Sequence, residues 1–298
     1  MLKSLPLLTL VSLLSAACVS LPDTTAAKPI PAGSRYVAMG SSFASGPGVT
    51  RLADDRDPRC TRSYDNYARQ TARQLQLELV DVSCGGATSD HVLNGWNELP
   101  PQVAALTEDT RLVTVTIGGN DVGYVAGLFA GSCSETASAS EVVKTACAKM
   151  RQLGGIRPVA AVALSDEEKW TAAEAGLFAI AAEVARRAPK ARLVFVQYLT
   201  LLPIGTLCSV APLSPAAAEK ARNTATRLAK MTETVALKSG AEVLPIADIS
   251  AGHDACAPTP WATAFVPTDP STAKGFVPYH PNLDGMTAVA DALIKKLR

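Results

Sequence analysis

The chain has 298 residues, of which 48% are hydrophobic and 18% charged, which is enough apolar material for a large core in one or two domains. Its 28 Lys and Arg residues against 27 Asp and Glu residues give a formal net charge of +1. No basic patch of the kind by which nucleic-acid-binding proteins contact phosphates is visible in the sequence, so no nucleic acid is expected as a partner.

The first residues predict an export signal. Lys3 supplies a positive start, residues 5–14 are mostly apolar, and residues 15–17 are small side chains typical of a cleavage site. The apolar part is shorter than a membrane-spanning helix requires. We therefore predict a signal peptide over residues 1–17 and an exported protein, with a buried N-terminal helix as the alternative.

Residues 14–18 (Leu-Ser-Ala-Ala-Cys) are similar to a bacterial lipobox, with Ser15 where Leu is usual. Cys18 would then carry a lipid that anchors the protein to a membrane, facing the periplasm or the cell exterior. Ordinary cleavage nearby, which gives a fully soluble product, is the alternative. Residues 18–31 contain prolines among small and polar residues and are predicted to be a tether, followed by one catalytic-type domain over residues 32–298.

The chain has seven cysteines, and setting Cys18 aside leaves six that can pair in an exported protein. Six cysteines can pair in many ways, so their number alone selects no connectivity. No group of Cys and His residues has the spacing of a zinc site, and no metal is therefore expected.

Three predicted strands each end in a turn of glycine and polar residues. The strands cover residues 36–39, 79–82 and 112–117, and the turns are Gly40-Ser41-Ser42, Gly85-Gly86 and Gly118-Gly119-Asn120-Asp121. In an open α/β sheet, ligands bind at the carboxyl ends of the strands. A serine there can act as a nucleophile if a base reaches it, and glycine N–H groups and an Asn amide can donate to a ligand. Plain tight turns and helix N-caps are the alternatives.

Predicted helices alternate with the strands. Helices are predicted over residues 64–79, 166–188, 215–239 and 283–297, and two further strands over residues 193–198 and 242–246. This alternation predicts a parallel sheet with helices on both faces. Residues 124–130, rich in Ala, Leu and Phe, either line an acyl pocket or belong to the core.

The chain has only three histidines, His91, His253 and His280. A serine nucleophile needs a base with a near-neutral pKa, and this base is usually a histidine. His280 lies between Pro278 and Pro281, in a loop that precedes the last predicted helix. Because most histidines in proteins are structural, the residues alone do not choose among the three.

Four blocks, taken together and in this order, resemble the SGNH (GDSL) hydrolase family. They are Gly40–Gly48, Cys84–Thr88, Gly118–Asp121 and His280–Asn282. They are most similar to the secreted, disulfide-bearing lipase/esterase branch known from actinobacteria. The resemblance implies a flavodoxin-like three-layer α/β/α sandwich with a mostly parallel sheet, and a hydrolase of carboxylic esters that needs no cofactor.

The resemblance also implies roles for individual residues. Ser42 matches the nucleophile and His280 the general base of the family. The Ser42 N–H, the Gly86 N–H and the Asn120 side chain match the oxyanion donors, whose alignment commonly contributes a large part of the catalysis.

Two positions depart from the family pattern. Ser41 stands where the first block usually has Asp, and Val277 stands where many members have Asp before the histidine. The branch therefore implies a Ser-His dyad, in which a backbone carbonyl near Val277 or Pro278 accepts the ring N–H and fixes the tautomer. Asp254 or Asp284 is a remote alternative to this carbonyl, and we do not favour it.

The branch further implies three disulfides, Cys60–Cys84, Cys133–Cys147 and Cys208–Cys256, with Cys18 unpaired and His253 structural beside its disulfide. The expected substrates are acyl esters, of lipids or small molecules. A carbohydrate O-acetyl esterase is the second possibility. A surface binding protein that kept the fold and lost the chemistry is the alternative from another class.

Overall fold

The computed structural model describes residues 29–53, 57–135, 144, 147–148, 166–266 and 276–298. A five-stranded parallel sheet with the order β2-β1-β3-β4-β5 lies at its centre. The strands are β1 (Arg35–Gly40), β2 (Glu78–Asp81), β3 (Thr110–Thr116), β4 (Arg192–Val196) and β5 (Glu242–Leu244). The predicted parallel α/β sheet is confirmed.

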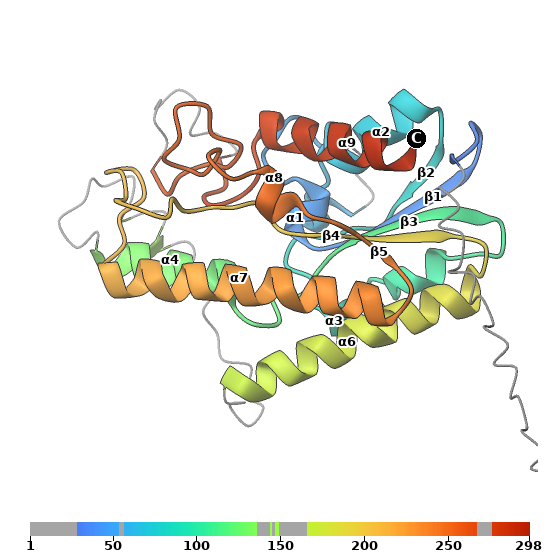
Figure 1. Ribbon diagram of the computed structural model, residues 1–298, viewed down its shortest axis with the longest axis horizontal. Helices are drawn as coiled ribbons and strands as arrows, with labels where there is room; N and C mark the ends of the chain where they lie inside the picture. Colours follow the sequence, from blue (N-terminus) through green and yellow to red (C-terminus); the bar gives the residue numbers. More distant parts are fainter. Residues whose placement is uncertain (1–28, 54–56, 136–143, 145–146, 149–165, 267–275) are drawn as a thin grey trace, which may run out of the picture.

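Helices cover both faces of this sheet. They are α1 (Ser42–Ser45), α2 (Tyr67–Leu75), α3 (Ser89–Asn94), α4 (Tyr124–Glu135), α6 (Asp166–Arg187), α7 (Pro215–Lys238), α8 (Ile246–Ile249) and α9 (Leu283–Leu297), with short 3₁₀ turns η1 (Pro58–Cys60) and η2 (Gln102–Ala105). Figure 1 shows α2 and α9 together on one face and α3, α6 and α7 on the other. The predicted three-layer α/β/α arrangement is confirmed.

The central strands consist of runs of consecutive buried residues. In β1, the side chains from Tyr36 to Met39 are fully buried, and in β3 all residues except Arg111 are buried. Strands that are covered by helices on both faces need such runs rather than alternation. The edge strand β2 is only half-buried, as expected for a strand with one unpaired side.

The helix predicted over residues 64–79 is wrong at both ends. Asn66 caps α2 by accepting the Arg69 N–H at 3.0 Å, so the helix begins at Tyr67. Gln76 adopts a left-handed conformation with φ 54°, and this ends the helix after Leu75. β2 then begins at Glu78, one residue earlier than predicted.

Three disulfides join Cys60 to Cys84, Cys133 to Cys147 and Cys208 to Cys256, which are the pairs that the family resemblance implies. The proposed signal peptide, Cys18 and the tether up to residue 28 lie outside the described residues. Within the described part of the chain, no helix combines the length and apolar character needed to cross a membrane.

Candidate active site

The turn after β1 presents Ser42 at the carboxyl edge of the sheet. Gly40, the last residue of β1, has φ 136°, and a Cβ atom placed there would lie 2.4 Å from the Thr116 carbonyl oxygen of β3. Only glycine fits this close approach. The Ser41 N–H donates to the same Thr116 carbonyl at 2.9 Å, and α1 begins at the next residue, Ser42. Ser41 therefore stands at the N-cap position, but its side chain makes no capping hydrogen bond.

His280 meets Ser42 across a distance of 238 residues in the chain. Its Nε2 lies 2.8 Å from Ser42 Oγ, and its Nδ1 lies 2.7 Å from the Pro278 carbonyl oxygen. Because a carbonyl can only accept, the proton of the neutral ring is on Nδ1, and Nε2 is left to accept the Ser42 hydroxyl proton. Burial lowers the pKa of His280 to about 4, against the smaller opposing effect of the Pro278 carbonyl. The ring is thus neutral at pH 7 and can take a proton from a serine.

The loop that carries His280 is held by Thr263. The Thr263 hydroxyl accepts the His280 N–H at 3.1 Å and donates to the Val277 carbonyl at 2.7 Å. The backbone of Thr263 adds two further hydrogen bonds, to the His280 carbonyl at 2.9 Å and from the Tyr279 N–H at 3.1 Å. One residue thereby fixes the loop on both sides of the histidine.

Three potential hydrogen-bond donors come from the turns after β1, β2 and β3. The N–H groups of Ser42 and Gly86 donate no hydrogen bond within the described residues. The Asn120 amide donates to the Ala87 carbonyl at 2.9 Å, which brings the third turn against the second. Free N–H groups of this kind can stabilise an oxyanion.

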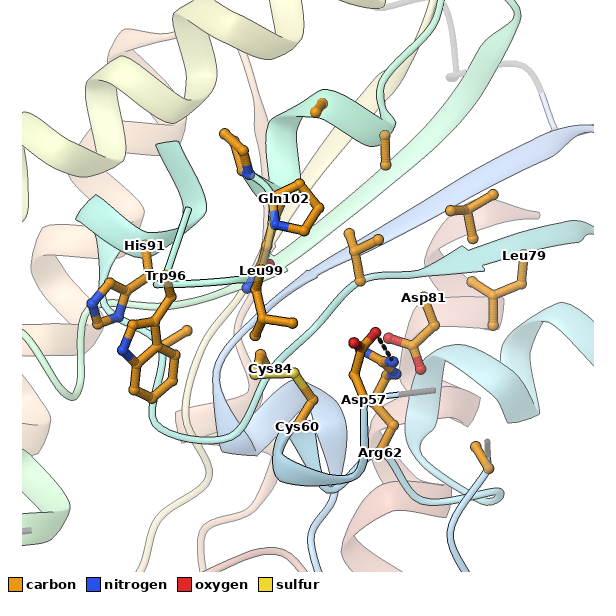
Figure 2. A pocket seen from close by; sticks show the side chains of 18 of the residues that line it. Asp57, Cys60, Arg62, Leu79, Asp81, Cys84, His91, Trp96, Leu99 and Gln102 are labelled. Atoms are coloured by element: carbon orange, nitrogen blue, oxygen red, sulfur yellow. Dashed lines mark hydrogen bonds and ion pairs between the residues drawn. A yellow bond between two sulfur atoms is a disulfide. The ribbon is translucent and has the colours of Figure 1, made fainter. Parts of the chain in front are cut away.

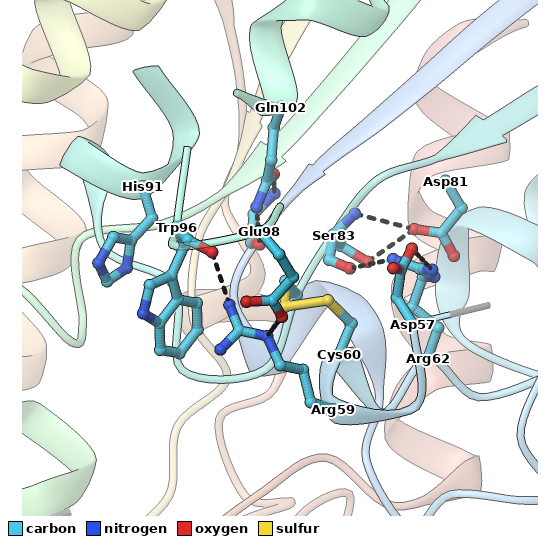
Figure 3. The surroundings of a disulfide bond; sticks show 12 residues. Asp57, Arg59, Cys60, Arg62, Asp81, Ser83, His91, Trp96, Glu98 and Gln102 are labelled. Atoms are coloured by element: carbon cyan, nitrogen blue, oxygen red, sulfur yellow. Dashed lines mark hydrogen bonds and ion pairs between the residues drawn. A yellow bond between two sulfur atoms is a disulfide. The ribbon is translucent and has the colours of Figure 1, made fainter. Parts of the chain in front are cut away.

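The turn after β2 is joined to the turn after β1 by a backbone hydrogen bond, and to η1 by a backbone hydrogen bond and a disulfide. The Cys84 N–H donates to the Gly40 carbonyl at 3.0 Å, and the Gly85 N–H donates to the Cys60 carbonyl at 2.9 Å. The Cys60–Cys84 disulfide also joins η1 to the turn after β2, and its surroundings are drawn in Figure 3. Cys84 and Gly85, the two residues before Gly86, are therefore both held in place by contacts with other segments.

Tyr198 and Thr263 contribute contacts at the site that the sequence analysis missed. The buried Tyr198 hydroxyl accepts the Gly119 N–H at 3.0 Å and lies 3.2 Å from Ser41 Oγ. It therefore joins the first and third turns. Tyr198 ends the strand predicted over residues 193–198, and a polar side chain at a strand end could have indicated a place near the site. Nothing in the sequence distinguishes Thr263.

The other two histidines have local partners. His91 Nδ1 accepts the Thr88 N–H at 3.1 Å as part of a capping box, and its ring stacks on Trp96 with centroids 4.4 Å apart. The His253 ring stacks on Trp261 at 3.9 Å. Asp254 accepts the Cys256 N–H at 2.9 Å, so this carboxylate is engaged beside the disulfide.

Two hollows flank the candidate site. The larger, of about 770 Å³, runs beside the edge strand β2, and its lining includes Leu79, Ala87, Trp96, Leu99 and Gln102 (Figure 2). The smaller, of about 250 Å³, lies against the His280 loop, and its lining includes Val49, Ala264, Val266, Phe276 and Val277. Among the described residues that line these hollows, neither Ser42 nor His280 is present.

The segment 124–130 belongs to the core. Tyr124, Val125, Leu128 and Phe129 are buried, and they line neither hollow. The Phe129 ring packs against Phe265 and Tyr279, with centroids 6.2 and 6.1 Å away. Of the two alternatives for this segment, the structure favours ordinary core.

Comparisons with known proteins agree with this fold. The model of the GDSL-like Lipase/Acylhydrolase family matches residues 38–288. "Lipase 2" of Streptomyces coelicolor is 30% identical over 265 residues, which cover 86% of this chain and 83% of that protein. The crystal structures of an extracellular lipase from Streptomyces rimosus and of phospholipase A1 from Streptomyces albidoflavus share the fold, with TM-scores of 0.66 and 0.65. They are 24% and 23% identical, and in both cases the match covers 89% of this chain and all of the other. The chain belongs to the GDSL-like lipase/acylhydrolase family and is a hydrolase that acts on ester bonds.

Proposed function

We propose that this protein cleaves acyl esters through a Ser42–His280 dyad. His280 Nε2 accepts the hydroxyl proton as Ser42 Oγ attacks the ester carbonyl and forms a tetrahedral intermediate. The protonated ring then gives this proton to the leaving alcohol. Water, activated by the same ring, attacks the acyl-enzyme and releases the carboxylic acid, which restores Ser42.

The observation that carries this proposal is the chain of contacts from Ser42 Oγ through His280 to the Pro278 carbonyl, at 2.8 and 2.7 Å. The carbonyl holds the ring in the tautomer that accepts from serine, which is the orienting role of Asp in a triad. Unlike the Asp of a triad, the carbonyl carries no negative charge, so the imidazolium that forms during the reaction is stabilised less than in a triad.

The oxyanion is proposed to rest on the N–H groups of Ser42 and Gly86 and on the Asn120 amide. Two observations support these donors: the three turns come together, and within the described residues the two backbone N–H groups have no other acceptor. Asn120 uses one amide hydrogen on Ala87 and has a second one for the oxyanion.

Lipid acyl esters are the proposed substrates. The similarity of the chain to "Lipase 2" of Streptomyces coelicolor supports this choice. We also propose that the protein is exported and that Cys18 carries a lipid anchor after cleavage behind residue 17, with residues 18–31 as tether and residues 32–298 as the catalytic domain. The three disulfides fit an oxidising compartment.

Hydrolysis of p-nitrophenyl esters from acetyl to palmitoyl tests the proposal. Ser42→Ala and His280→Ala are each expected to lower kcat by at least about 10⁴-fold, as in other serine hydrolases. Ser45→Ala is the matched control, because Ser45 lies on the same helix, is fully buried, and its hydroxyl has no hydrogen-bond partner in the described residues. Full activity in Ser42→Ala would refute the site.

The preferred chain length decides the substrate class. An optimum at medium or long chains supports a lipase, and activity confined to acetyl esters supports a carbohydrate O-acetyl esterase. If the folded protein hydrolyses none of these esters, covalent labelling by an organophosphonate is the second test. Failure of Ser42 to react would support a binding protein that has lost the chemistry.

A further inference from the structure

We propose that Gln102 is a positioning residue that holds the nucleophile turn and the oxyanion turn in register. The proposal rests on the function proposed above. Gln102 is the first residue of η2, and its side chain is 6% exposed. Its Oε1 accepts the Gly40 N–H at 2.7 Å, and its Nε2 donates to the Gly40 carbonyl at 3.1 Å. Figures 2 and 3 show this side chain extending from η2 toward the ends of the strands.

The Gln102 amide takes the place that a neighbouring strand would occupy. Pairing of β1 with β2 ends at Ala38 and Asp81, and the Val82 N–H still donates to the Ala38 carbonyl. Beyond this point the Cys84 N–H still donates to the Gly40 carbonyl, but the buried Gly40 N–H donates to Gln102 and not to a carbonyl of this segment. A side-chain amide offers one acceptor and one donor, as a peptide group does, so it can complete the ladder at Gly40.

Gly40 joins two parts of the proposed site. Its carbonyl accepts from Gln102 and also from the Cys84 N–H at 3.0 Å, and Cys84 leads directly into Gly85 and Gly86. Its own next residues are Ser41 and the proposed nucleophile Ser42. A shift of Gly40 would therefore change the distance between the nucleophile and the oxyanion donor Gly86.

Gln102 limits this shift from one side, and Thr116 limits it from the other. A Cβ at Gly40 would lie 2.4 Å from the Thr116 carbonyl, so Gly40 is already pressed against β3. Without Gln102 the Gly40 N–H would be buried with no acceptor, and the turn would move to reach water. The geometry thus points to Gln102 as a residue that acts on the reaction through Gly40 and not through contact with the reacting atoms.

The first variant is Gln102→Met, which keeps the volume and removes both hydrogen bonds. We expect kcat for p-nitrophenyl acetate to fall about 10- to 100-fold, because a misplacement of reacting groups by about 1 Å has an effect of this size. KM is expected to stay within about twofold, because the residue does not hold the ester. A rise in KM with kcat unchanged would mean that Gln102 acts only as part of the lining of the larger hollow, and it would overturn the proposal.

The second variant is Gln102→Glu, and its readout is a pH profile. A protonated Glu can donate and accept as Gln does, whereas the ionised form has no donor for the Gly40 carbonyl. We therefore expect the ratio of kcat in Gln102→Glu to kcat in wild type to rise as the pH falls from about 8 to about 5. Wild type stays active over this range, because the pKa of His280 is about 4. A ratio that does not change with pH would contradict the proposal. This test can be made even if Gln102→Met fails to fold.

Other charged groups near η2 are present in both the wild type and Gln102→Glu. Their titration therefore affects both values of kcat and cancels in the ratio. Arg35 donates to the Ala105 carbonyl of η2. The hollow that Gln102 lines also contains Asp57, Arg62, Arg69, Asp81 and His91.

Gln197 provides the matched control. It is 7% exposed, and its amide donates to the Ala229 carbonyl of α7 at 3.1 Å. Gln197→Met and Gln197→Glu are expected to lower the unfolding temperature but to leave kcat and its pH profile within about twofold of wild type, because no reacting group depends on this contact. An equal loss of kcat at Gln197 would assign both effects to stability and overturn the proposal. If instead Ser42→Ala keeps full activity, the proposed function itself fails, which is a different result from wild-type kcat in Gln102→Met.

Discussion

Ser42, Gly86 and Asn120 stand in the turns that follow β1, β2 and β3, whereas His280 lies in the loop that precedes α9. The turns are joined by a backbone hydrogen bond from Cys84 to Gly40 and by side-chain hydrogen bonds of Asn120 and Tyr198. The His280 loop is bonded by both the hydroxyl and the backbone of one residue, Thr263. The support of the strand-end side is therefore spread over several residues, whereas much of the support of the loop side comes from one.

Removing a donor from the strand-end side should have the largest effect. Asn120→Ala is expected to lower kcat by about 10²- to 10³-fold with little change in KM, because the donor acts on charge that develops in the transition state. Steady-state kinetics on p-nitrophenyl esters measure this. Asn94→Ala is the control, since Asn94 lies on the surface of α3 and its side chain donates to the exposed Asp90. A rise in KM with kcat unchanged would contradict the proposed role of Asn120 as an oxyanion donor.

Thr263→Val tests the loop side. Valine keeps the shape of threonine but cannot donate to the Val277 carbonyl or accept the His280 N–H. We expect kcat to fall about tenfold, because the base becomes less well oriented toward Ser42. Thr232→Val on α7 is the control, as its buried hydroxyl donates to the Leu228 carbonyl. If both variants keep wild-type kcat, the loop needs no help from Thr263.

Tyr198→Phe tests the link between the first and third turns. The change leaves the buried Gly119 N–H without its acceptor, and should lower the free energy of unfolding by about 1–3 kcal/mol. We expect a smaller loss of kcat than in Thr263→Val, because Gly40 and Thr116 still hold the Ser42 turn. Chemical denaturation and kinetics measure the two effects. Ser41→Ala, which keeps the bond to Gly119, should destabilise the protein less.

The pH profile of the wild type tests how strongly burial affects His280, the proposed base. His280 must be neutral to accept a proton, and burial lowers its pKa to about 4. The rate should thus stay constant as the pH falls through 6.5 and decline only near pH 4. The acid limb of kcat/KM gives this value. An apparent pKa at or above 6.5 would mean that the ring is more hydrated than its burial indicates.

Sequence patterns predicted the parts of this protein that depend on periodicity or on short motifs. The strands and the range of α9 follow from such local signals, whereas the meeting of Ser42 with His280 was expected only from the resemblance to the family. The supporting contacts do not. Gln102 lies 62 residues from Gly40, in a short irregular segment, and its partner is backbone, which leaves no mark on the sequence.

Local conformation explains the misplaced boundaries. Gln76 takes a left-handed φ of 54°, which is unusual for a residue other than glycine, so the end of α2 could not be read from composition. Thr263 acts through hydrogen bonds to a loop with neither helical nor strand period, and such contacts become visible only in three dimensions.

The stack of His91 on Trp96 has a consequence for spectroscopy. The half-buried Trp96 ring stands beside Gly86, so close that a Cβ there would lie 3.1 Å from the indole. Indole emission depends on the polarity around the ring and is quenched by a protonated imidazole in contact with it. The protein therefore carries an optical reporter next to Gly86, and the fluorescence of Trp96 should change when an inhibitor fills the space in front of the Gly86 N–H.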